Sequence, residues 1–456
     1  MAKTRTTFQC QDCGVPAPQW VGRCAACGAW GSLEEVREVA STDRSSGRVL
    51  VPTPIGDVDP IGATPRSSGI SELDRVLSGG FVPGSVTLLG GEPGIGKSTL
   101  LLQTLGAMSA AGARCMLVTG EESPEQVRLR AERLHVLEPN LAVVAETDIP
   151  SILATAESFA PHVLAIDSIQ TVHDPGLAGV PGSVAQVRDG AQQVVRLAKR
   201  TGITVMLVGH VTKEGTLAGP RVLEHLVDTV LSFEGDRHHA LRMMHAPKHR
   251  FGGTQELGLF EMSSTGLQGV ADPSAMFLAD RLADAPGSVV VPLIEGSRPL
   301  IVELQALVTP TSAPMPRRSA QGLDSGRLAM MIAVLEQRVK LSLSGCEVYA
   351  SVAGGVRASE TALDLALACA IASAATERPL HDKLVVIGEV GLVGEVRSVP
   401  HAPRRLAEAA RLGFTHAVVP PGTPPVDGLT LIPVASVAEG IGMALRRLES
   451  HNAPGQ

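Results

Sequence analysis

The chain is 456 residues long, 44% of its residues are hydrophobic and 19% are charged, and its formal net charge is −7 at pH 7. This composition excludes a disordered or fibrous chain, and the negative charge argues against a globally basic nucleic-acid binder. No apolar run reaches the ~18 residues that span a bilayer, and the N-terminus leads into no signal peptide, so we expect a cytoplasmic protein with no membrane partner.

Four of the seven cysteines form two CxxC pairs near the N-terminus, Cys10 with Cys13 and Cys24 with Cys27, and a glycine follows each pair. Four thiolates at this spacing suit a closed, tetrahedral Zn²⁺ site. Two disulfides are the alternative, but they fit poorly with a cytoplasmic chain, and a redox CxxC would need a βαβ context. We therefore predict a zinc module over residues 1–36.

A linker and an α/β domain are expected next. Residues 37–66 are rich in Ser, Gly, Pro and Asp without sustained periodicity, which is typical of a linker. In residues 67–271 apolar runs alternate with helical patterns, which predicts an α/β domain with a mostly parallel sheet. The expected strands cover residues 85–90, 115–119, 141–145, 163–167, 203–209 and 227–233.

The string GEPGIGKS over residues 91–98 follows an apolar run and opens into a helical pattern. This is the context of a P-loop, in which glycines let backbone N–H groups turn onto the phosphates of a nucleoside triphosphate. Lys97 would reach the β- and γ-phosphate oxygens, and the Ser98 hydroxyl would ligate Mg²⁺. A glycine-rich turn that matches by chance is the alternative. The residues expected to hold the nucleotide are Gly91, Glu92, Pro93, Gly94, Ile95, Gly96, Lys97, Ser98 and Thr99.

Two further strand ends carry candidate site residues. One apolar run ends at Asp167, a carboxylate that would hold Mg²⁺ and its waters beside Ser98. A strand that ends at a helix-capping Asp is the alternative. Another run ends at His210, which would contact the nucleotide as a sensor of the γ-phosphate, and a packing role for it is equally open.

The run over residues 115–119 is followed by Glu121 and Glu122, and a carboxylate there would polarise the water that attacks the γ-phosphate. The alternative is that Glu122 or Ser123 caps the helix that begins at Pro124. Because two glutamates can divide these two roles, we favour Glu121 as the base.

Residues 272–456 follow the pattern of a second α/β domain, in which the stretch GEVGLVGEV over residues 388–396 resembles the Lon protease domain. Lon-type proteolysis needs a Ser–Lys dyad. Pro403 stands where the lysine would be, and Ser359 is better explained as a helix N-cap than as a nucleophile. We therefore expect a Lon-protease-like fold without a Ser–Lys dyad, which would serve as a scaffold for DNA binding or oligomerisation.

Several motifs taken together resemble the RadA (Sms) family of bacterial DNA repair and recombination ATPases, which is related to RecA and to DnaB-type helicases. They are the cysteine module with Trp20 and Trp30, GEPGIGKS, GEES at 120–123, IDSIQT at 166–171, PGSVAQVR at 181–188, GHVTKEG at 209–215 and KHRFG at 248–252. The resemblance runs nearly end to end. It implies a RecA-like P-loop core that uses ATP and Mg²⁺, a hexameric ring on single-stranded and branched DNA, branch migration, and a RecA-type recombinase as partner.

The family pentapeptide KNRFG, which belongs to the coupling of nucleotide and DNA, reads KHRFG here, with His249 in place of Asn. The resemblance implies that Lys248 and Arg250 stabilise the γ-phosphate charge on a neighbouring subunit, as cations do in phosphoryl transfer. A solvated basic turn is the alternative.

DNA binding would rest mainly on phosphate contacts, because the chain has only eight Phe, two Trp and one Tyr for base stacking. We expect contacts in two loops, residues 173–183 and 212–221, which leave the nucleotide-facing end of the sheet, and in basic stretches of the C-terminal domain. The candidate nucleic-acid contacts are Arg188, Lys213, Arg221, Arg317, Arg318, Arg404 and Arg405.

Two other functions share parts of this pattern. An ATP-driven Lon-type protease would need the missing dyad. A KaiC-like signalling ATPase shares the P-loop and the paired glutamates, but it would not explain the zinc module, the KHRFG turn or the Lon-like domain.

Overall fold

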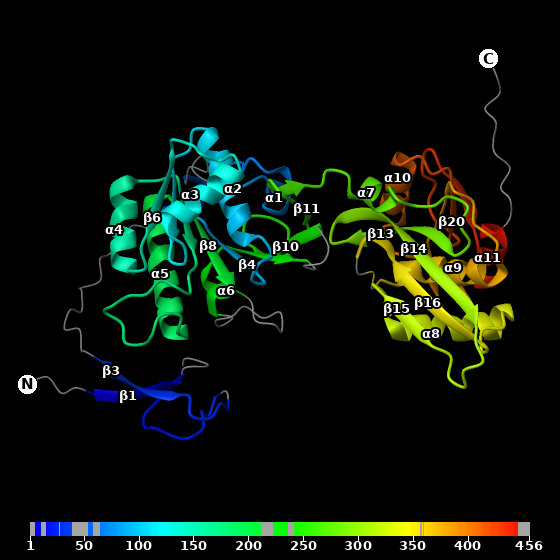
Figure 1. Ribbon diagram of the computed structural model, residues 1–456, viewed down its shortest axis with the longest axis horizontal. Helices are drawn as coiled ribbons and strands as arrows, with labels where there is room; N and C mark the ends of the chain where they lie inside the picture. The colour runs from blue at the N-terminus through cyan, green and yellow to red at the C-terminus, as the bar shows by residue number, and fades with distance from the viewer. Residues whose placement is uncertain are drawn as a thin grey trace, which may run out of the picture. The chain divides into compact units, whose positions relative to one another are not determined.

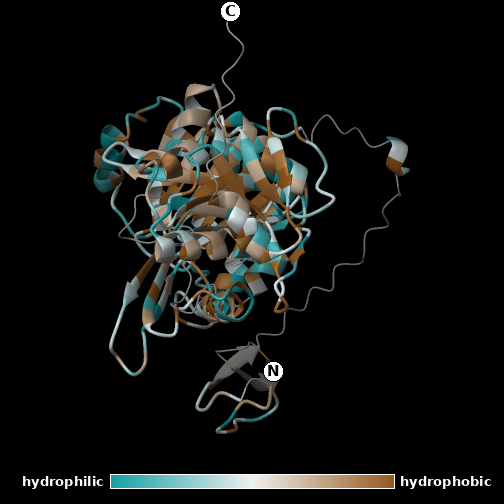
Figure 2. Cartoon of the chain, turned by 90° about the vertical axis from the view of Figure 1, so that its right-hand side faces the viewer, coloured by the Kyte–Doolittle hydropathy of each residue, from teal (hydrophilic) through white to brown (hydrophobic). Residues whose placement is uncertain are grey.

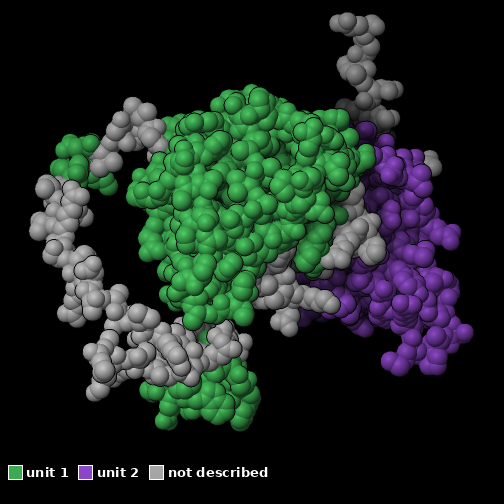
Figure 3. Space-filling view, turned by 60° about the vertical axis from the view of Figure 1, so that its left-hand side comes forward, with its two compact units in different colours: residues 1–270 green, residues 271–456 purple. Residues whose placement is uncertain are grey.

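A computed structural model describes residues 5–10, 15–26, 28–38, 53–57, 64–210, 222–235, 241–355, 358 and 360–445. The chain divides into two compact units, residues 1–270 and 271–456, which Figure 3 draws in green and purple. Within the described ranges no helix is both long enough and apolar enough to cross a membrane.

The N-terminal segment forms a small antiparallel sheet in the order β2-β1-β3. Its strands are β1 (Arg5–Cys10), β2 (Pro16–Ala17) and β3 (Leu33–Glu38). Cys10, Cys24 and Leu33 are buried together at its centre. A 3₁₀ turn, η1 (Ile55–Asp57), lies between this sheet and the larger sheet of unit 1 in the sequence.

The rest of unit 1 is built on a nine-stranded sheet in the order β12-β11-β10-β9-β4-β8-β7-β5-β6 (Figure 1). Its parallel strands are β4 (Val86–Gly91), β5 (Cys115–Thr119), β6 (Leu141–Ala145), β7 (Val163–Asp167), β8 (Thr204–His210) and β9 (Thr229–Glu234). All six expected strands are confirmed, with bounds within two residues of the prediction. Antiparallel strands extend the sheet beyond β9, namely β10 (Leu241–His249), β11 (Leu257–Ser263) and β12 (Gly266–Gly269).

Helices cover both faces of this sheet. They are α1 (Ser71–Val76), α2 (Lys97–Ala110), α3 (Pro124–Arg133), α4 (Ile149–Phe159), α5 (Val184–Thr201) and α6 (Val222–Leu226). Successive residues of a strand point to opposite faces, and those of β7 alternate between two hydrophobic clusters: Ala165 packs with α1–α3, and Leu164 and Ile166 pack with α4–α6. The strands therefore read as continuous apolar runs. Figure 2 shows brown, hydrophobic ribbon gathered in the interior of the molecule.

The parallel direction of the strands sets the position of the candidate site. Gly91 at the end of β4 pairs with His210 at the end of β8, and Thr119 at the end of β5 pairs with Asp167 at the end of β7. The carboxyl ends of β4, β8, β7 and β5 therefore lie side by side, which is where open α/β sheets bind ligands.

Unit 2 contains a mixed seven-stranded sheet in the order β15-β16-β14-β13-β17-β20-β21. Its strands are β13 (Ser288–Glu295), β14 (Arg298–Pro310), β15 (Arg318–Gln321), β16 (Cys346–Val352), β17 (Leu384–Val386), β20 (His416–Val419) and β21 (Thr430–Pro433), and a separate hairpin joins β18 (Glu389–Val390) and β19 (Val396–Arg397).

Unit 2 contains one central, buried helix. α9 (Asp364–Thr376) is buried along its first ten residues, so it forms the middle of the domain. The other helices are α7 (Pro273–Leu278), α8 (Ser325–Val334) continued by the π-helix η3 (Leu335–Val339), α10 (Ala402–Arg411) and α11 (Val437–Ala444), with short 3₁₀ turns η4 (Ala353–Gly355) and η5 (Thr361–Leu363).

Candidate functional site

The predicted P-loop joins the end of β4 to the start of α2. Gly94 and Gly96 have φ angles of +80° and +117°, a left-handed conformation that side chains disfavour. A Cβ on Gly96 would also lie 2.7 Å from the Met262 methyl carbon. Gly96 is the N-cap residue of α2, so the loop leads directly to the N–H groups of the first helical turn, which attract phosphate.

Lys97, the first residue of α2, lies within this loop. Its side chain is buried, and Nζ donates hydrogen bonds to the carbonyl oxygens of Gly91 at 2.8 Å and Glu92 at 2.9 Å. Burial lowers the pKa of Lys97, while the negative charges of Asp167 and Glu121 raise it. One ammonium group and two carboxylates therefore share the site.

Asp167 and Ser98 meet at the expected Mg²⁺ position. The Ser98 side chain hydrogen-bonds to Asp167, which lowers the pKa of that carboxyl, but burial outweighs this effect and raises it, and Glu121 and Glu122 raise it further. A half-buried carboxylate with a raised pKa and a neighbouring hydroxyl is a set of oxygen donors that a divalent cation would stabilise. The residues present therefore fit Mg²⁺.

The two glutamates after β5 have different partners. Glu121 accepts a hydrogen bond of 2.6 Å from the buried hydroxyl of Ser168, the residue after Asp167. Glu122 instead forms an ion pair of 2.5 Å with Arg130 of α3, and its N–H group donates to the Thr119 hydroxyl. Glu121 is thus held beside Asp167 and Lys97, whereas Glu122 is held by α3.

Ser123 caps the following helix. Its hydroxyl accepts from the N–H group of Gln126, the Gln126 side chain accepts from the N–H group of Ser123, and Pro124 begins α3. This is a complete capping box, so the helix start needs neither glutamate. The capping alternative is confirmed for Ser123, which leaves both glutamates available for other roles.

The structure describes little of His210 and of the segment that follows it. The backbone of His210 lies in β8 beside Gly91, and its proposed role as a phosphate sensor remains a prediction. Lys213 and Arg221, with the loop over residues 212–221, lie outside the described residues.

The other predicted DNA loop is held at its base by a residue that the sequence analysis missed. The buried side chain of Gln186 accepts from the N–H group of Asp174 at 2.8 Å and donates to the carbonyl oxygens of Asp174 and Leu177. At the tip of the loop, Val180 is exposed. The PGSVAQVR motif contains Gln186, but only the fold reveals which loop it holds.

Lys248 and Arg250 lie at the edge of the sheet opposite the P-loop. Lys248 belongs to β10, not to a turn, and its Nζ donates to the carbonyl oxygens of Glu224 and Val227 at the end of α6. Arg250 follows β10, and its guanidinium lies 3.2 Å from the carboxylate of Asp228, which also binds Lys199. Burial, followed by the charge of Arg250, lowers the pKa of Lys248.

The ladder gives the separation of these cations from the P-loop. The Arg250 N–H group donates to the Asp228 carbonyl, and the Asp228 N–H group donates to that of Val86, the first residue of β4. Arg250 is thus level with the start of β4, and the P-loop begins at its end, Gly91. Five steps of ~3.3 Å separate the two levels by about 17 Å.

His249, which replaces the family Asn, has a structural partner. It pairs with Thr229 in the ladder between β10 and β9, and its Nδ1 lies 3.0 Å from the Thr229 hydroxyl. Burial lowers the pKa of His249, which favours the neutral ring.

The two CxxC segments of the N-terminal module turn in the same way. The Cys10 N–H group donates to the Val15 carbonyl at 3.1 Å, and the Cys24 N–H group donates to the Ala29 carbonyl at 2.8 Å, five residues on in both cases. Cys10 and Cys24 are buried in one cluster, whereas Cys13 and Cys27 lie outside the described residues. Two equivalent turns that bring buried thiols together fit a structural Zn²⁺ ion.

One predicted nucleic-acid contact is wrong. Arg405 is only 2% exposed, and its guanidinium binds both carboxylate oxygens of Glu360, at 2.7 and 2.5 Å, and the carbonyl oxygens of Pro292 and Pro400. A buried guanidinium with four such contacts cannot reach a phosphate, so Arg405 has a structural role. Arg188, Arg317, Arg318 and Arg404 are exposed, and their predicted contacts stay predictions.

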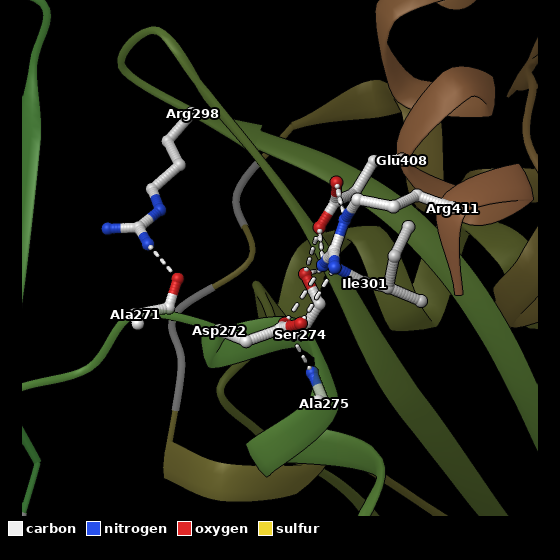
Figure 4. Close-up of polar contacts among 8 residues, drawn as sticks. All are labelled: Ala271, Asp272, Ser274, Ala275, Arg298, Ile301, Glu408 and Arg411. Atoms are coloured by element: carbon white, nitrogen blue, oxygen red, sulfur yellow. Dashed lines mark hydrogen bonds and ion pairs between the residues drawn. The ribbon is translucent and has the colours of Figure 1, made fainter.

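Arg411 in the same basic stretch is also held internally (Figure 4). It binds both carboxylate oxygens of Asp272, at 2.8 and 2.9 Å, and it contacts Glu408. Glu408 accepts from the hydroxyl of Ser274, which in turn accepts from the N–H group of Ile301. This network joins α10 to α7 and β14.

Comparison with known proteins agrees with this arrangement. Three family patterns match the chain: "Rubredoxin metal binding domain" over residues 8–35, "AAA domain" over residues 66–216, and "Subunit ChlI of Mg-chelatase" over residues 337–423. The first unit therefore carries a rubredoxin-like zinc ribbon and a P-loop ATPase core.

Similar proteins extend over nearly the whole chain. A protein named "DNA repair protein RadA" from Bacillus subtilis is 44% identical over 456 residues, covering 98% of this chain and 100% of that protein. Proteins of the same name from Streptococcus pyogenes serotype M1 and Pseudomonas aeruginosa are 49% and 48% identical, covering 92% and 97% of this chain and 93% and 99% of their own lengths.

The different partners of the two glutamates lead to a prediction. Glu121→Gln should bind ATP but hydrolyse it about 10²–10⁴-fold more slowly, because it lacks the carboxylate that activates water. The matched Glu122→Gln variant should lose only its ion pair with Arg130 and keep most of its turnover. Single-turnover hydrolysis with a nucleotide-binding assay tests this, with Lys97→Ala as the inactive reference. The assignment is reversed if Glu122→Gln proves the slower of the two.

The equivalent cysteine turns lead to a second prediction. Protein purified under reducing conditions should contain one Zn²⁺ per chain, with four sulfur ligands in the X-ray absorption spectrum. Replacing Cys24 and Cys27 with Ala should release the metal and unfold only the N-terminal module, because the linker isolates it from the ATPase core. Cys346→Ala is the control and should keep the metal. Disulfides in place of metal would contradict the prediction.

Proposed function

Because the chain belongs to the RadA family, we propose that it is a DNA-dependent ATPase that acts in recombinational DNA repair. The observation that carries this proposal is the row of strand ends at one edge of the sheet. There the P-loop, Asp167 and Glu121 lie together, as phosphoryl transfer to water requires.

Each residue has a distinct part in the proposed mechanism. The N–H groups of the P-loop and the Lys97 ammonium bind the phosphates, and Lys97 can exchange its hydrogen bonds to the carbonyl oxygens of Gly91 and Glu92 for bonds to phosphate. Asp167 and Ser98 would hold Mg²⁺, which neutralises phosphate charge when bound. Glu121 accepts a proton from the attacking water, and Ser168 orients its carboxylate through their hydrogen bond.

The cations at the opposite edge support hydrolysis between subunits. Lys248 and Arg250 are level with the beginning of β4, about 17 Å before the P-loop at ~3.3 Å per residue, so they cannot reach a nucleotide held by their own subunit. Arg250 still has about half of its side chain exposed. We infer that Arg250, with Lys248, acts on the nucleotide of the adjacent subunit in a closed ring, with a hexamer as the expected size.

Action on DNA follows from the same arrangement. The loops over residues 173–183 and 212–221 follow β7 and β8, the strands that end at Asp167 and His210. Loss of the γ-phosphate would therefore move DNA contacts, and the ring would travel on single-stranded and branched DNA, promote branch migration and work with a RecA-type recombinase. Proteolysis is disfavoured, because Pro403 lies in the first turn of α10 at the position where a Lon-type lysine would stand.

The experiment compares activators of ATP hydrolysis. Single-stranded DNA should raise the steady-state rate of the full chain severalfold, while an unfolded polypeptide should leave it unchanged. The salt dependence of binding should be steep and the sequence dependence weak, because the contacts are mainly to phosphate. A rate raised by polypeptide would favour a protease, and a rate insensitive to both would favour a signalling ATPase.

A further inference from the structure

A second group of cations lies at the amino-terminal ends of the parallel strands. A cavity of about 510 Å³ is lined there by Arg66, Arg114, His162 and Arg200, which we name the basic pocket. Arg114 and His162 come just before β5 and β7, and Arg200 lies near the end of α5. The pocket is therefore at the opposite end of β5 and β7 from Glu121 and Asp167, and it is not part of the nucleotide site.

Backbone groups hold the Arg114 and His162 side chains in place. For Arg66 only the backbone is fixed, by two hydrogen bonds of 2.8 Å that it exchanges with the backbone of Phe81. The Arg114 guanidinium donates to the Ala160 carbonyl at 2.8 Å, and the Arg114 N–H group donates to Nδ1 of His162 at 2.9 Å. Because Nδ1 accepts, the proton of the neutral ring is on Nε2, which is therefore a donor.

The positive charges of the pocket exceed its negative ones. Glu157 is the single carboxylate among the lining residues, and it is paired with Arg200 in an exposed contact that stabilises little. Burial, followed by the charges of Arg66 and Arg114, lowers the pKa of His162 and keeps the ring neutral. Three guanidinium groups thus converge on one cavity in a chain of net charge −7.

The chemistry of these groups favours a phosphate ester. Guanidinium groups bind phosphate oxygens with two parallel hydrogen bonds, and an anion beside His162 would lie near the charges of both Arg66 and Arg114. All three arginines are exposed, so a long polyanion can pass over the pocket without entering an enclosed space. The lining has no Phe, Tyr or Trp on which the base of a free nucleotide would stack.

We propose that the basic pocket binds the phosphate backbone of DNA outside the two loops at the other edge of the sheet. This inference rests on the proposed DNA-dependent function and adds a contact site to it. The pocket would hold a strand against the ATPase core independently of the nucleotide, because none of its residues touches the P-loop.

The test replaces the charges and keeps the fold. In the variant Arg66→Gln, Arg114→Gln, Arg200→Gln, the affinity for a single-stranded oligonucleotide should fall about tenfold or more. The slope of log affinity against log salt should fall by about 0.7 for each phosphate that the variant no longer binds. The control Arg128→Gln, Arg133→Gln, Arg196→Gln changes the net charge equally at exposed helical positions and should bind as the wild type does. Basal ATP hydrolysis should be unchanged in both.

A second variant, Arg66→Gln with Arg200→Gln, keeps the Arg114 hydrogen bond to Ala160 and covers the case in which the triple variant unfolds. Unchanged affinity and salt slope in a folded variant, beside a wild type that DNA stimulates, would overturn the pocket assignment alone. Inorganic tripolyphosphate serves as a probe for phosphate binding without DNA. A folded variant that binds less tripolyphosphate than the wild type but binds DNA equally well would overturn the assignment too. A wild type that fails to bind DNA would overturn the proposed function itself.

Discussion

The direction of the parallel strands is the constraint on which the rest of unit 1 depends. In a parallel ladder every strand presents its carboxyl end to the same edge, so residues distant in the sequence meet there without long loops. Glu121, Asp167 and the P-loop follow three different strands and converge for this reason. The same geometry places the residues just before each parallel strand at the other edge. Arg250 lies at that edge too, because it follows β10, which runs antiparallel to β9.

Charged groups at the two edges of the sheet have different partners. At the carboxyl edge, burial lowers the pKa of Lys97 and raises that of Asp167. The charged forms of both side chains are therefore destabilised there, and bound phosphates and a cation would stabilise them. At the amino edge, Lys248 is satisfied by carbonyl oxygens of α6 and Arg250 by Asp228. In the proposed function, one subunit therefore carries the groups that bind the phosphates together with cations that it cannot apply to its own nucleotide.

The sequence predicted the strands and the P-loop well because apolar runs and fixed glycine spacing are local signals. It favoured Glu121 as the base, but it could not show the partners that distinguish the two glutamates, Ser168 and Arg130, which are distant or on another element. It wrongly predicted that Arg405 contacts DNA. A charged residue of an amphipathic helix is normally exposed, and the sequence does not reveal that Glu360 forms a buried ion pair with Arg405. It also placed Lys248 in a turn, because the last residues of β10 are polar and lack the apolar pattern of the first ones.

Mixing two inactive variants tests the division of the catalytic groups between subunits most directly. Glu121→Gln protein keeps Arg250, and Arg250→Ala protein keeps Glu121, so a mixed ring contains sites in which both groups are intact. Differently tagged subunits, purified together through both tags, should recover ATP hydrolysis that neither variant shows alone. If such mixed assemblies hydrolyse ATP no faster than the separate variants, the two groups serve the same subunit and the account is wrong.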